Sequence, residues 1–341
     1  MYSVANVQIH ASQFPAQVQQ DLIASLLGRR VNHKFHYDSV KQTQKWLALH
    51  QAYSPSRTDP DCAVVYDLGF AATIRALPVG QTHLVGLGCG GGQKDSRLLR
   101  HLIEAGHEVS YTPSDVSLAM VLVARESALR VINDSACHPL VCDLASATDL
   151  AAVLGSQGAP KGSRLFTFFG MIPNFESGTI LPRLASLLDP SDWLIFSANL
   201  APGPDYFAGI RKILPLYDNA LTRDWLMTFL LDLGVELGDG KLSFRIEAEP
   251  EDGGLMRVGA WFGFLHRRCN RVDDRVFEFE VGDEIRLFFS YRHTPLIVEE
   301  RLARVGIRVC DQWITKSGEE GVFLCRLNGI GPGDLATAQA S

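Results

Sequence analysis

The sequence predicts an α/β fold, in which a mostly parallel sheet carries helices on both faces and is interrupted by a long insertion. Between residues 83 and 199, short apolar runs alternate with segments of helical periodicity, which is typical of a parallel sheet. Beyond residue 200 longer strand-like runs replace this alternation, and it returns near residue 296. A chain of 341 residues has room for both this sheet and a second, α+β unit.

The first part of the predicted sheet ends at residue 143. Its first strand is buried and leads into a glycine loop, and Ser117 is well placed to cap a helix because its hydroxyl can accept a backbone N–H. In chain order we expect a strand at 83–88, a helix at 94–105, a strand at 109–115, a helix at 117–130 and a strand at 139–143.

The second part of the sheet contains an apolar run at 164–170, as expected for a central parallel strand that is buried on both faces. Two strands near the end of the chain are joined by a short link, which predicts an antiparallel pair. A parallel core closed by such a pair is the seven-stranded, Rossmann-like arrangement of class I methyltransferases. The further elements expected here are a helix at 176–188, a strand at 193–199, a helix at 297–305 and strands at 307–314 and 321–327.

These boundaries predict two domains that are both discontinuous in the sequence. Residues 60–199 and 296–328 would form the Rossmann-like domain that binds the cofactor. Residues 1–59 and 200–295 would form an α+β domain that binds the substrate, and 329–341 would be a tail.

Composition and charge narrow the functional classes. A net charge of −6 argues against a general nucleic-acid binder, which is normally basic. No apolar run reaches the roughly 18 residues needed to cross a bilayer, and the first residues lack the regions of a secretion signal. We therefore expect a cytoplasmic protein with no membrane partner. The cysteines form no CxxC pair and the sequence has no HExxH, so we expect no metal site.

Two acids follow strands beside the glycine loop at 86–92. Asp115 ends the second predicted strand, where a carboxylate can hold two ribose hydroxyls, and Asp143 ends the third, where methyltransferases often contact the adenine amine. Either acid alone could instead be a helix N-cap. Together with the loop they predict a site for a nucleotide or for S-adenosylmethionine.

Five segments resemble the histidine-specific, S-adenosylmethionine-dependent methyltransferase family of the ergothioneine pathway. The resemblance extends over residues 32–327 but is discontinuous, and the chain looks like a divergent member. The matching segments are FHYD at 35–38, YSPSRT at 53–58, LGCGGGQKDSRLL at 87–99, YTPSDVS at 111–117 and FFGMIPN at 168–174.

This resemblance implies a set of cofactor residues. Lys94 would lie against the methionine part of S-adenosylmethionine together with Gly88, Asp115 would bind its ribose and Asp143 its adenine. The full set of implied cofactor residues is Gly88, Gly90, Lys94, Asp115, Asp143, Leu144 and Gly170.

The resemblance also implies an amino-acid substrate that the second domain closes over. Asn174 would hold its α-amino-acid group, and Tyr217 would bind its carboxylate. Tyr37 and Tyr53 would lie beside its amine and orient it, so that with Asn174 they form the implied catalytic set.

Three positions of the substrate pocket can be compared with the family pattern, and two of them differ from it. Phe288 stands where the family has the glutamate that reads the imidazole, Ser290 stands at the family serine, and Ala260 stands where the family has a methionine. Because phenylalanine cannot accept a hydrogen bond from an imidazole, histidine is not the expected substrate. A larger or aromatic amino acid such as tryptophan is predicted instead, in a pocket to which Trp261, Phe289 and Tyr291 would contribute.

Several functions are compatible with these residues. The leading interpretation is a monomeric, S-adenosylmethionine-dependent N-methyltransferase acting on an α-amino acid. An alternative is an enzyme in which the amine of S-adenosylmethionine attacks its own γ-carbon, giving azetidine-2-carboxylate and methylthioadenosine, with aromatic rings around the sulfonium. The others are a non-catalytic cofactor-binding protein and a nucleotide-using enzyme of another class.

Overall fold

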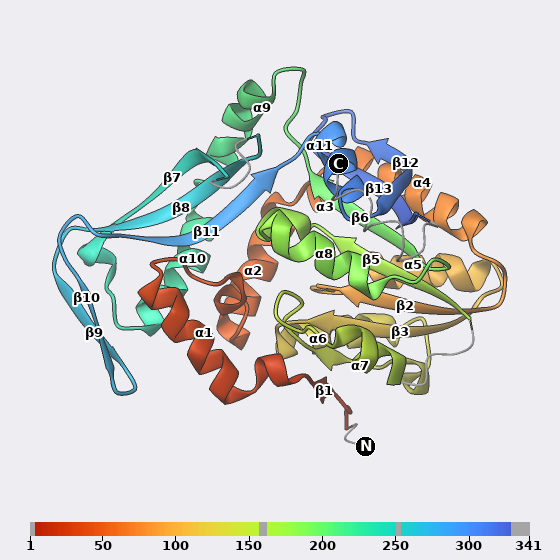
Figure 1. Cartoon of the computed structure of the whole chain (residues 1–341), viewed down its shortest axis with the longest axis horizontal. Helices are drawn as coiled ribbons and strands as arrows, with labels where there is room; N and C mark the ends of the chain where they lie inside the picture. Colours follow the sequence, from red (N-terminus) through yellow and green to blue (C-terminus); the bar gives the residue numbers. More distant parts are fainter. Residues whose placement is uncertain (1–3, 157–161, 250–253, 329–341) are drawn as a thin grey trace, which may run out of the picture.

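The computed structural model describes residues 4–156, 162–249 and 254–328, so the predicted tail at 329–341 lies outside the described residues. Two sheets stand side by side, with helices between and around them (Figure 1).

No helix in these ranges is long and apolar enough to cross a membrane. No group of three or more histidine, cysteine, aspartate or glutamate side chains is arranged to hold a metal ion in the same ranges.

The main sheet has eight strands within the described residues. Those from β1 to β6 run parallel, whereas β13 runs antiparallel to both β6 and β12. An α/β fold with a mixed sheet is thus confirmed. In spatial order the strands are β1 (Gln8–Ile9), β4 (Leu140–Val141), β3 (Glu108–Asp115), β2 (Gln81–Leu87), β5 (Ser163–Phe169), β6 (Trp193–Asn199), β13 (Glu320–Leu327) and β12 (Ile307–Ile314).

The expectation of seven strands is wrong by one, because β1 adds to the edge of the sheet beside β4. Its pairing joins Gln8 to Leu140 and Ile9 to Val141. Both β1 side chains are exposed, so the strand carries no apolar pattern that a sequence reading could detect.

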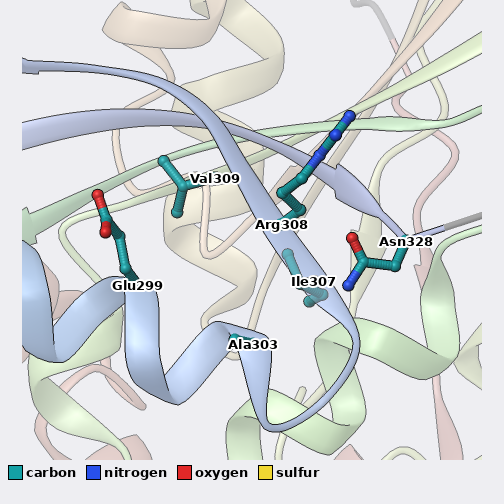
Figure 2. Close-up of a pocket in the computed structure, with 6 residues that line it drawn as sticks. All are labelled: Glu299, Ala303, Ile307, Arg308, Val309 and Asn328. Carbon is teal, nitrogen blue, oxygen red and sulfur yellow. The ribbon is translucent and has the colours of Figure 1, made fainter.

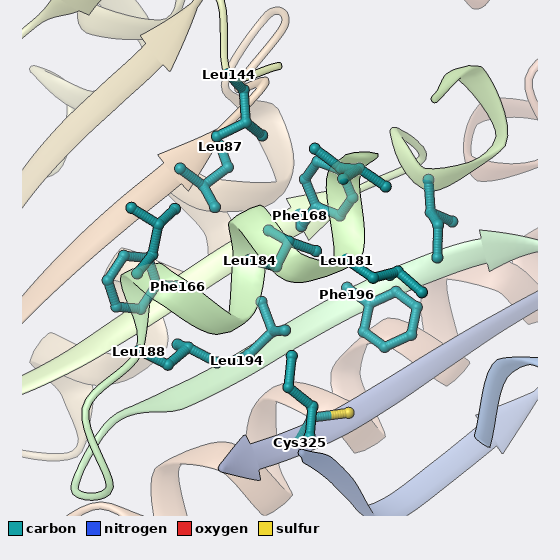
Figure 3. Close-up of a cluster of buried hydrophobic side chains, with 14 of the residues drawn as sticks. Leu87, Leu144, Phe166, Phe168, Leu181, Leu184, Leu188, Leu194, Phe196 and Cys325 are labelled. Carbon is teal, nitrogen blue, oxygen red and sulfur yellow. The ribbon is translucent and has the colours of Figure 1, made fainter. Parts of the chain in front are cut away.

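Helices cover both faces of the main sheet, because successive side chains of a strand point to opposite sides. Leu84 and Leu165 face one layer, formed by α4, α5 and α6, while Val85 and Phe166 face the other, formed by α7, α8 and α11. Figure 3 shows the second of these layers. The helices are α4 (Pro60–Ala76), α5 (Gln93–Glu104), α6 (Leu118–Ala128), α7 (Leu150–Ser156), α8 (Ser177–Leu187) and α11 (Pro295–Ala303).

The second sheet is built from the insertion and has its own apolar core. It is antiparallel in the order β11–β8–β7, and a separate β9–β10 hairpin extends from it at the left of Figure 1. Its core also takes in residues of α1 and α10, so the N-terminal segment packs here. The elements are α1 (Pro15–Leu27), α2 (Val40–Tyr53), α3 (Pro55–Thr58), α9 (Tyr206–Ile213), α10 (Ala220–Asp232), β7 (Gly240–Ala248), β8 (Met256–Phe264), β9 (Arg268–Val272), β10 (Arg275–Phe279) and β11 (Glu284–Arg292).

Short 3₁₀ turns connect these elements, and two of them enter the site described below. The turn η4 (Ile172–Asn174) follows β5, and η5 (Leu214–Leu216) follows α9. The others are η1 (Ala11–Gln13), η2 (His33–His36), η3 (Asp134–Ala136) and η6 (Leu237–Asp239).

A register shift in β11 decides which of its side chains face the space between the sheets. The pairing with β8 is irregular between Arg286 and Phe288. Ile285, which precedes the shift, and Leu287, which stands at it, pack in the core of the second sheet. After the shift, the residues that line the cavity between the sheets are the alternate ones: Phe288, Ser290 and Arg292. Bulges of this kind commonly re-aim side chains near functional sites.

We predict that Phe166→Ala will destabilise the protein by about 3–5 kcal/mol, because it empties a fully buried position in a central strand. The measurement is the free energy of unfolding in urea. The exposed phenylalanine of α9 supplies the control, since Phe207→Ala should cost less than about 1 kcal/mol. Equal effects of the two substitutions would contradict the core assignment.

Candidate active site

A cavity of about 520 Å³ lies where the carboxyl ends of β2, β3, β5 and β6 meet the second sheet. Its lining includes the loop after β2, the turn η4, one side of α2 and the three residues of β11 that follow the register shift. Most predicted site residues line it, namely Tyr37, Tyr53, Gly88, Gly90, Lys94, Asp115, Gly170, Asn174, Tyr217, Phe288 and Ser290. Asp143, Leu144 and Ala260 are not among its lining residues.

The glycine loop is held in a backbone conformation that other residues rarely adopt. Gly88, Gly90 and Gly92 have φ angles of +66°, +50° and +69°, in the left-handed region. A Cβ on Gly92 would lie 2.7 Å from the backbone of Ala124, so this glycine also allows α5 to pack closely against α6. The loop therefore exposes its backbone to the cavity.

Asp115 ties this loop to the end of β3. Its Oδ2 accepts the N–H of Gly90 at 3.1 Å, and its Oδ1 accepts the N–H of Ser117 at 3.0 Å. Burial raises the pKa of Asp115 to about 6, although these backbone N–H groups favour the charged form. Near neutral pH the group is thus an ionised carboxylate at the cavity wall, suited to accept hydrogen bonds from hydroxyl groups.

Asp95 lies beside Gly86 at the cavity, and the sequence analysis did not identify it. A Cβ on Gly86 would lie 2.3 Å from Oδ2 of Asp95, so the acid of α5 occupies the volume beside this glycine. Asp95 accepts hydrogen bonds from Tyr111 at 2.6 Å and Thr167 at 2.8 Å. Burial raises its pKa to about 6. The sequence held a signal for this residue: position 86 is a glycine rather than an acid, and the first turn of the next helix contains an acid.

Lys94 already has an anionic neighbour. Its Nζ lies 3.6 Å from Oε1 of Glu320 and donates to the hydroxyl of Tyr66 at 2.5 Å. Glu320 stands at the start of β13 and also lines the cavity, which sequence reasoning did not foresee. Since the lysine charge is balanced by this glutamate, Lys94 does not present an unpaired cation.

Asp143 and Leu144 lie behind the cavity wall. Oδ1 of Asp143 accepts the N–H of Ala145 at 3.0 Å, and its Oδ2 is 3.6 Å from the buried Nζ of Lys34. The acid thus holds the turn that follows β4, and it is not the N-cap of a helix. Leu144 packs in the main core near Leu87 (Figure 3).

The side of the cavity formed by the second sheet is aromatic. The ring of Phe288 lies 5.7 Å from that of Trp225 and 6.3 Å from that of Tyr217. Tyr37 lies 5.6 Å from Trp225 and 5.9 Å from Trp46. Burial and the nearby Asp115 raise the pKa of Tyr37 above its ordinary value, so it stays a neutral phenol. Neither tryptophan was identified from the sequence.

Some aromatic residues that the sequence placed in this pocket point elsewhere. Phe289 and Tyr291 lie on the opposite face of β11 and pack in a separate cluster with Leu255. The guanidinium of Arg245 stacks over the ring of Trp261, with its central carbon 4.2 Å from the ring centroid. The expectation that these three rings line the pocket is wrong, because successive side chains of a strand point to opposite faces. Phe289 and Tyr291 alternate with the lining residues Phe288 and Ser290, and Trp261 of β8 stands opposite Arg286, which does not line the cavity. Ala260 is buried opposite Phe288 in the register of the sheet.

The polar residues that line the cavity near β11 and η4 differ in whether their side chains already have hydrogen-bond partners. The hydroxyl of Tyr217 donates to Ser290 at 2.8 Å and accepts from Arg292 at 2.8 Å. By contrast, the side-chain amide of Asn174 has no hydrogen-bond partner among the described residues and lines the cavity. Tyr53 is half exposed at the end of α2, on the rim.

An ionic network joins the turn that carries Asn174 to the second sheet. Glu176, two residues further on, accepts from Arg257 at 3.1 Å and from the hydroxyl of Tyr291, and Arg286 is 3.7 Å away. Both arginines are buried. This network fixes the distance between the two walls of the cavity.

A smaller cavity of about 300 Å³ lies between α11 and β12 (Figure 2). It is lined by Glu299, Ala303, Ile307, Arg308, Val309 and Asn328, none of which the sequence analysis selected. The larger cavity is therefore the candidate active site.

Comparison with known proteins gives one clear family match. The model of the family described as "Histidine-specific methyltransferase, SAM-dependent" matches residues 19–327. Histidine N-alpha-methyltransferase of Mycobacterium tuberculosis (strain CDC 1551 / Oshkosh) is 25% identical over 310 residues, which cover 85% of this chain and 88% of that protein.

Solved structures are less similar. The CcbJ methyltransferase from Streptomyces caelestis has 12% identity and a TM-score of 0.38, covering 77% of this chain and 96% of its own. Magnesium protoporphyrin IX methyltransferase from Synechocystis PCC 6803 has 15% identity and a TM-score of 0.39, covering 92% and 100%. Likeness at this level carries no argument about function.

We predict that Asp95→Asn will flatten the pH dependence of stability. Because the pKa of Asp95 is raised from its ordinary value to about 6 in the folded protein, the folded state loses stability relative to the unfolded chain as pH rises from about 4 to about 6. The variant lacks this loss, so its stability relative to wild type should increase over that interval and level off above pH 7. Urea unfolding between pH 4 and 7.5 measures this. The fully exposed Asp274→Asn should follow wild type, and identical curves for Asp95→Asn and wild type would contradict the assignment.

Proposed function

The chain belongs to the histidine-specific, S-adenosylmethionine-dependent methyltransferase family, and from this premise we propose that it methylates the amine nitrogen of an α-amino acid other than histidine. The observation that carries the proposal is a single cavity with a glycine loop and an acid on one wall and, on the other, aromatic residues with no acid among the described residues that line it. As a working division, residues 60–199 and 296–328 bind the cofactor, and 1–59 and 200–295 bind the acceptor.

The cofactor is proposed to lie against the main-sheet wall. Asp115 would accept the two ribose hydroxyls, and Gly88, Gly90 and Gly170 would allow close approach because they present no side chain. Lys94 would contact the methionine part only together with its partner Glu320. The predicted adenine contact of Asp143 has less support, since its carboxylate already serves Ala145 and Lys34, and Leu144 would contribute by packing alone.

The acceptor amine is proposed to lie between Asn174 and the phenol of Tyr37. The unpartnered amide of Asn174 can bind the α-amino-acid group, and Tyr53 would close the site from the rim. The amine would act as the free base, and S-adenosylmethionine, when bound, would supply the methyl group to its nitrogen. With its raised pKa, Tyr37 remains protonated and orients the amine rather than removing its proton. Catalysis then rests mainly on positioning.

The side chain of the acceptor would meet Phe288 and Trp225. The acids that line the cavity are Asp95, Asp115, Glu319 and Glu320, and all four belong to the main-sheet wall. Among the described lining residues, the acceptor wall therefore has no acid that could accept a hydrogen bond from an imidazole. An aromatic acceptor such as tryptophan therefore suits this wall better than histidine, while Ser290 is engaged by Tyr217. Ala260 would act only by giving Phe288 room.

One experiment tests the proposed reaction. The protein is incubated with S-adenosylmethionine and each of the twenty amino acids in turn, and the products are identified by mass spectrometry. We expect S-adenosylhomocysteine and an N-methylated amino acid, with an aromatic one as the best substrate. Methylthioadenosine formed without any added amino acid would instead indicate cyclisation of the cofactor, and absence of every product would contradict the proposal.

We predict that Asp115→Ala will weaken the binding of S-adenosylhomocysteine by about 100-fold or more, because two hydrogen bonds to a partly buried carboxylate are lost. Isothermal calorimetry measures the affinity. The control is Asp274→Ala, which removes a fully exposed acid of the β9–β10 turn and should leave affinity unchanged. Unchanged affinity of Asp115→Ala would remove the basis of the ribose assignment.

We also predict that Phe288→Glu will raise the activity toward histidine relative to tryptophan by about tenfold or more, since a carboxylate at this position can accept a hydrogen bond from an imidazole. The measurement is kcat/KM for both amino acids. Phe288→Leu is the matched control, because it opens the pocket without adding an acceptor and should not favour histidine. A wild-type protein that already prefers histidine would contradict the pocket argument.

A further inference from the structure

Arg292, the last residue of β11, is a buried cation that faces the cavity. Only 8% of its surface is exposed, and it lines the same wall as Phe288 and Ser290. Its Nη2 donates to the hydroxyl of Tyr217 at 2.8 Å, and its Nη1 is 3.5 Å from the carbonyl of Leu200. Its Nε has no hydrogen-bond partner within the described chain.

No carboxylate of the described residues pairs with this guanidinium, which sets it apart from the other buried arginines. Taking a guanidinium out of water without an anionic partner is costly, and proteins normally supply one. The other buried arginines each have an acid within 4.0 Å: Arg125 with Asp134, Arg257 with Glu176 and Glu247, Arg286 with Glu176, and Arg301 with Glu249.

The backbone around Arg292 holds it in place. The N–H of His293 donates to Asn199 at the end of β6, and the N–H of Ala201 donates back to His293. The strand thus crosses from the second sheet to the main sheet at this residue. Because both hydrogen bonds fix the chain on either side of the junction, the guanidinium is preorganised at the base of the cavity.

We infer that Arg292 binds a carboxylate of the methyl acceptor, so that the substrate supplies the anion that the protein lacks. This inference rests on the proposed amino-acid acceptor. A carboxylate at this place would satisfy Nε and could receive a second hydrogen bond from Nη2, the geometry in which arginine and carboxylate pair most strongly. Tyr217 and Ser290 would position the guanidinium through their own hydrogen bonds.

Other cations at the cavity are less suited to this role. Arg57 lines the rim but is exposed, so water weakens any pair that it forms. Arg97 contacts Asp67, and Lys94 is balanced by Glu320. Every amino acid has an α-carboxylate that can pair with a guanidinium. Its side chain would meet the rings of Phe288 and Trp225, which line the same cavity.

The test compares an acceptor with its α-amide in wild type and in Arg292→Met. The amide lacks the negative charge but keeps the amine and side chain. In wild type we expect kcat/KM to fall by about 100-fold from acid to amide, and in the variant we expect the acid and the amide to be used equally. Arg292→Lys should recover part of the discrimination. The affinity for S-adenosylhomocysteine should change less than about threefold.

Arg223→Met serves as the matched control, because this arginine of α10 pairs with Asp218 and does not line the cavity. It should keep the discrimination between acid and amide. Three results would overturn the inference. In the first, kcat/KM for acid and amide fall by the same factor in Arg292→Met, so that the wild-type discrimination remains. In the second, the discrimination is lost in Arg57→Met instead. In the third, Arg292→Met greatly weakens the binding of S-adenosylhomocysteine, which would assign this arginine to the cofactor carboxylate.

If no amino acid is methylated, the proposed function fails, and Arg292 is then tested with simple carboxylates. Protein loaded with S-adenosylhomocysteine is titrated with acetate, propionate and benzoate by calorimetry. Binding that is at least about tenfold weaker in Arg292→Met than in Arg223→Met supports a carboxylate site. Equal binding, or none in wild type, contradicts it.

Discussion

The ion pairs that hold Glu176 to the second sheet are the contact on which the candidate site depends. Glu176 belongs to the main sheet's side of the molecule, whereas Arg257 and Tyr291 belong to the insertion. Arg257 is buried and also pairs with Glu247, whereas the side chain of Glu176 is 44% exposed. Loss of Glu176 would therefore remove a contact between the two sheets without leaving the arginine unpaired. Because Asn174 lies only two residues before Glu176, the same contact sets the position of its amide relative to β11. This contact, together with the junction at His293, holds the two walls of the cavity together.

Charge is distributed unequally between the two walls of the cavity. Its acids come from the main sheet, where burial raises the pKa of both Asp95 and Asp115 to about 6. The opposite wall presents aromatic rings and one buried guanidinium, that of Arg292. A cofactor that carries hydroxyl groups and a positive sulfonium suits the first wall, and an acceptor with a carboxylate suits the second. Under the proposed function, each ligand would therefore have its own side of the cavity.

The sequence predicted the main sheet well because its strands are buried on both faces and its helices have clear apolar spacing. It missed β1, whose two exposed residues carry no pattern. Asp115 could be found because the end of a parallel strand beside a glycine loop is a recurring place for such an acid. The side chains that come from distant segments could not be found, since Glu320 of β13 and Trp225 of α10 reach the cavity only through the tertiary fold. The register shift before Phe288 likewise has no signal in the sequence. Phe289 and Tyr291 were misplaced because they alternate with the lining residues Phe288 and Ser290 and so point to the other face of β11.

The central claim is that one cavity holds the cofactor against the main sheet and the acceptor against the second sheet. A crystal structure with S-adenosylhomocysteine and the amino acid that is turned over fastest tests this most directly. The account predicts the ribose at Asp115, the acceptor nitrogen between Asn174 and the cofactor sulfur, and the acceptor side chain against Phe288. An acceptor bound outside this cavity, or a cofactor whose ribose lies away from β3, would contradict it.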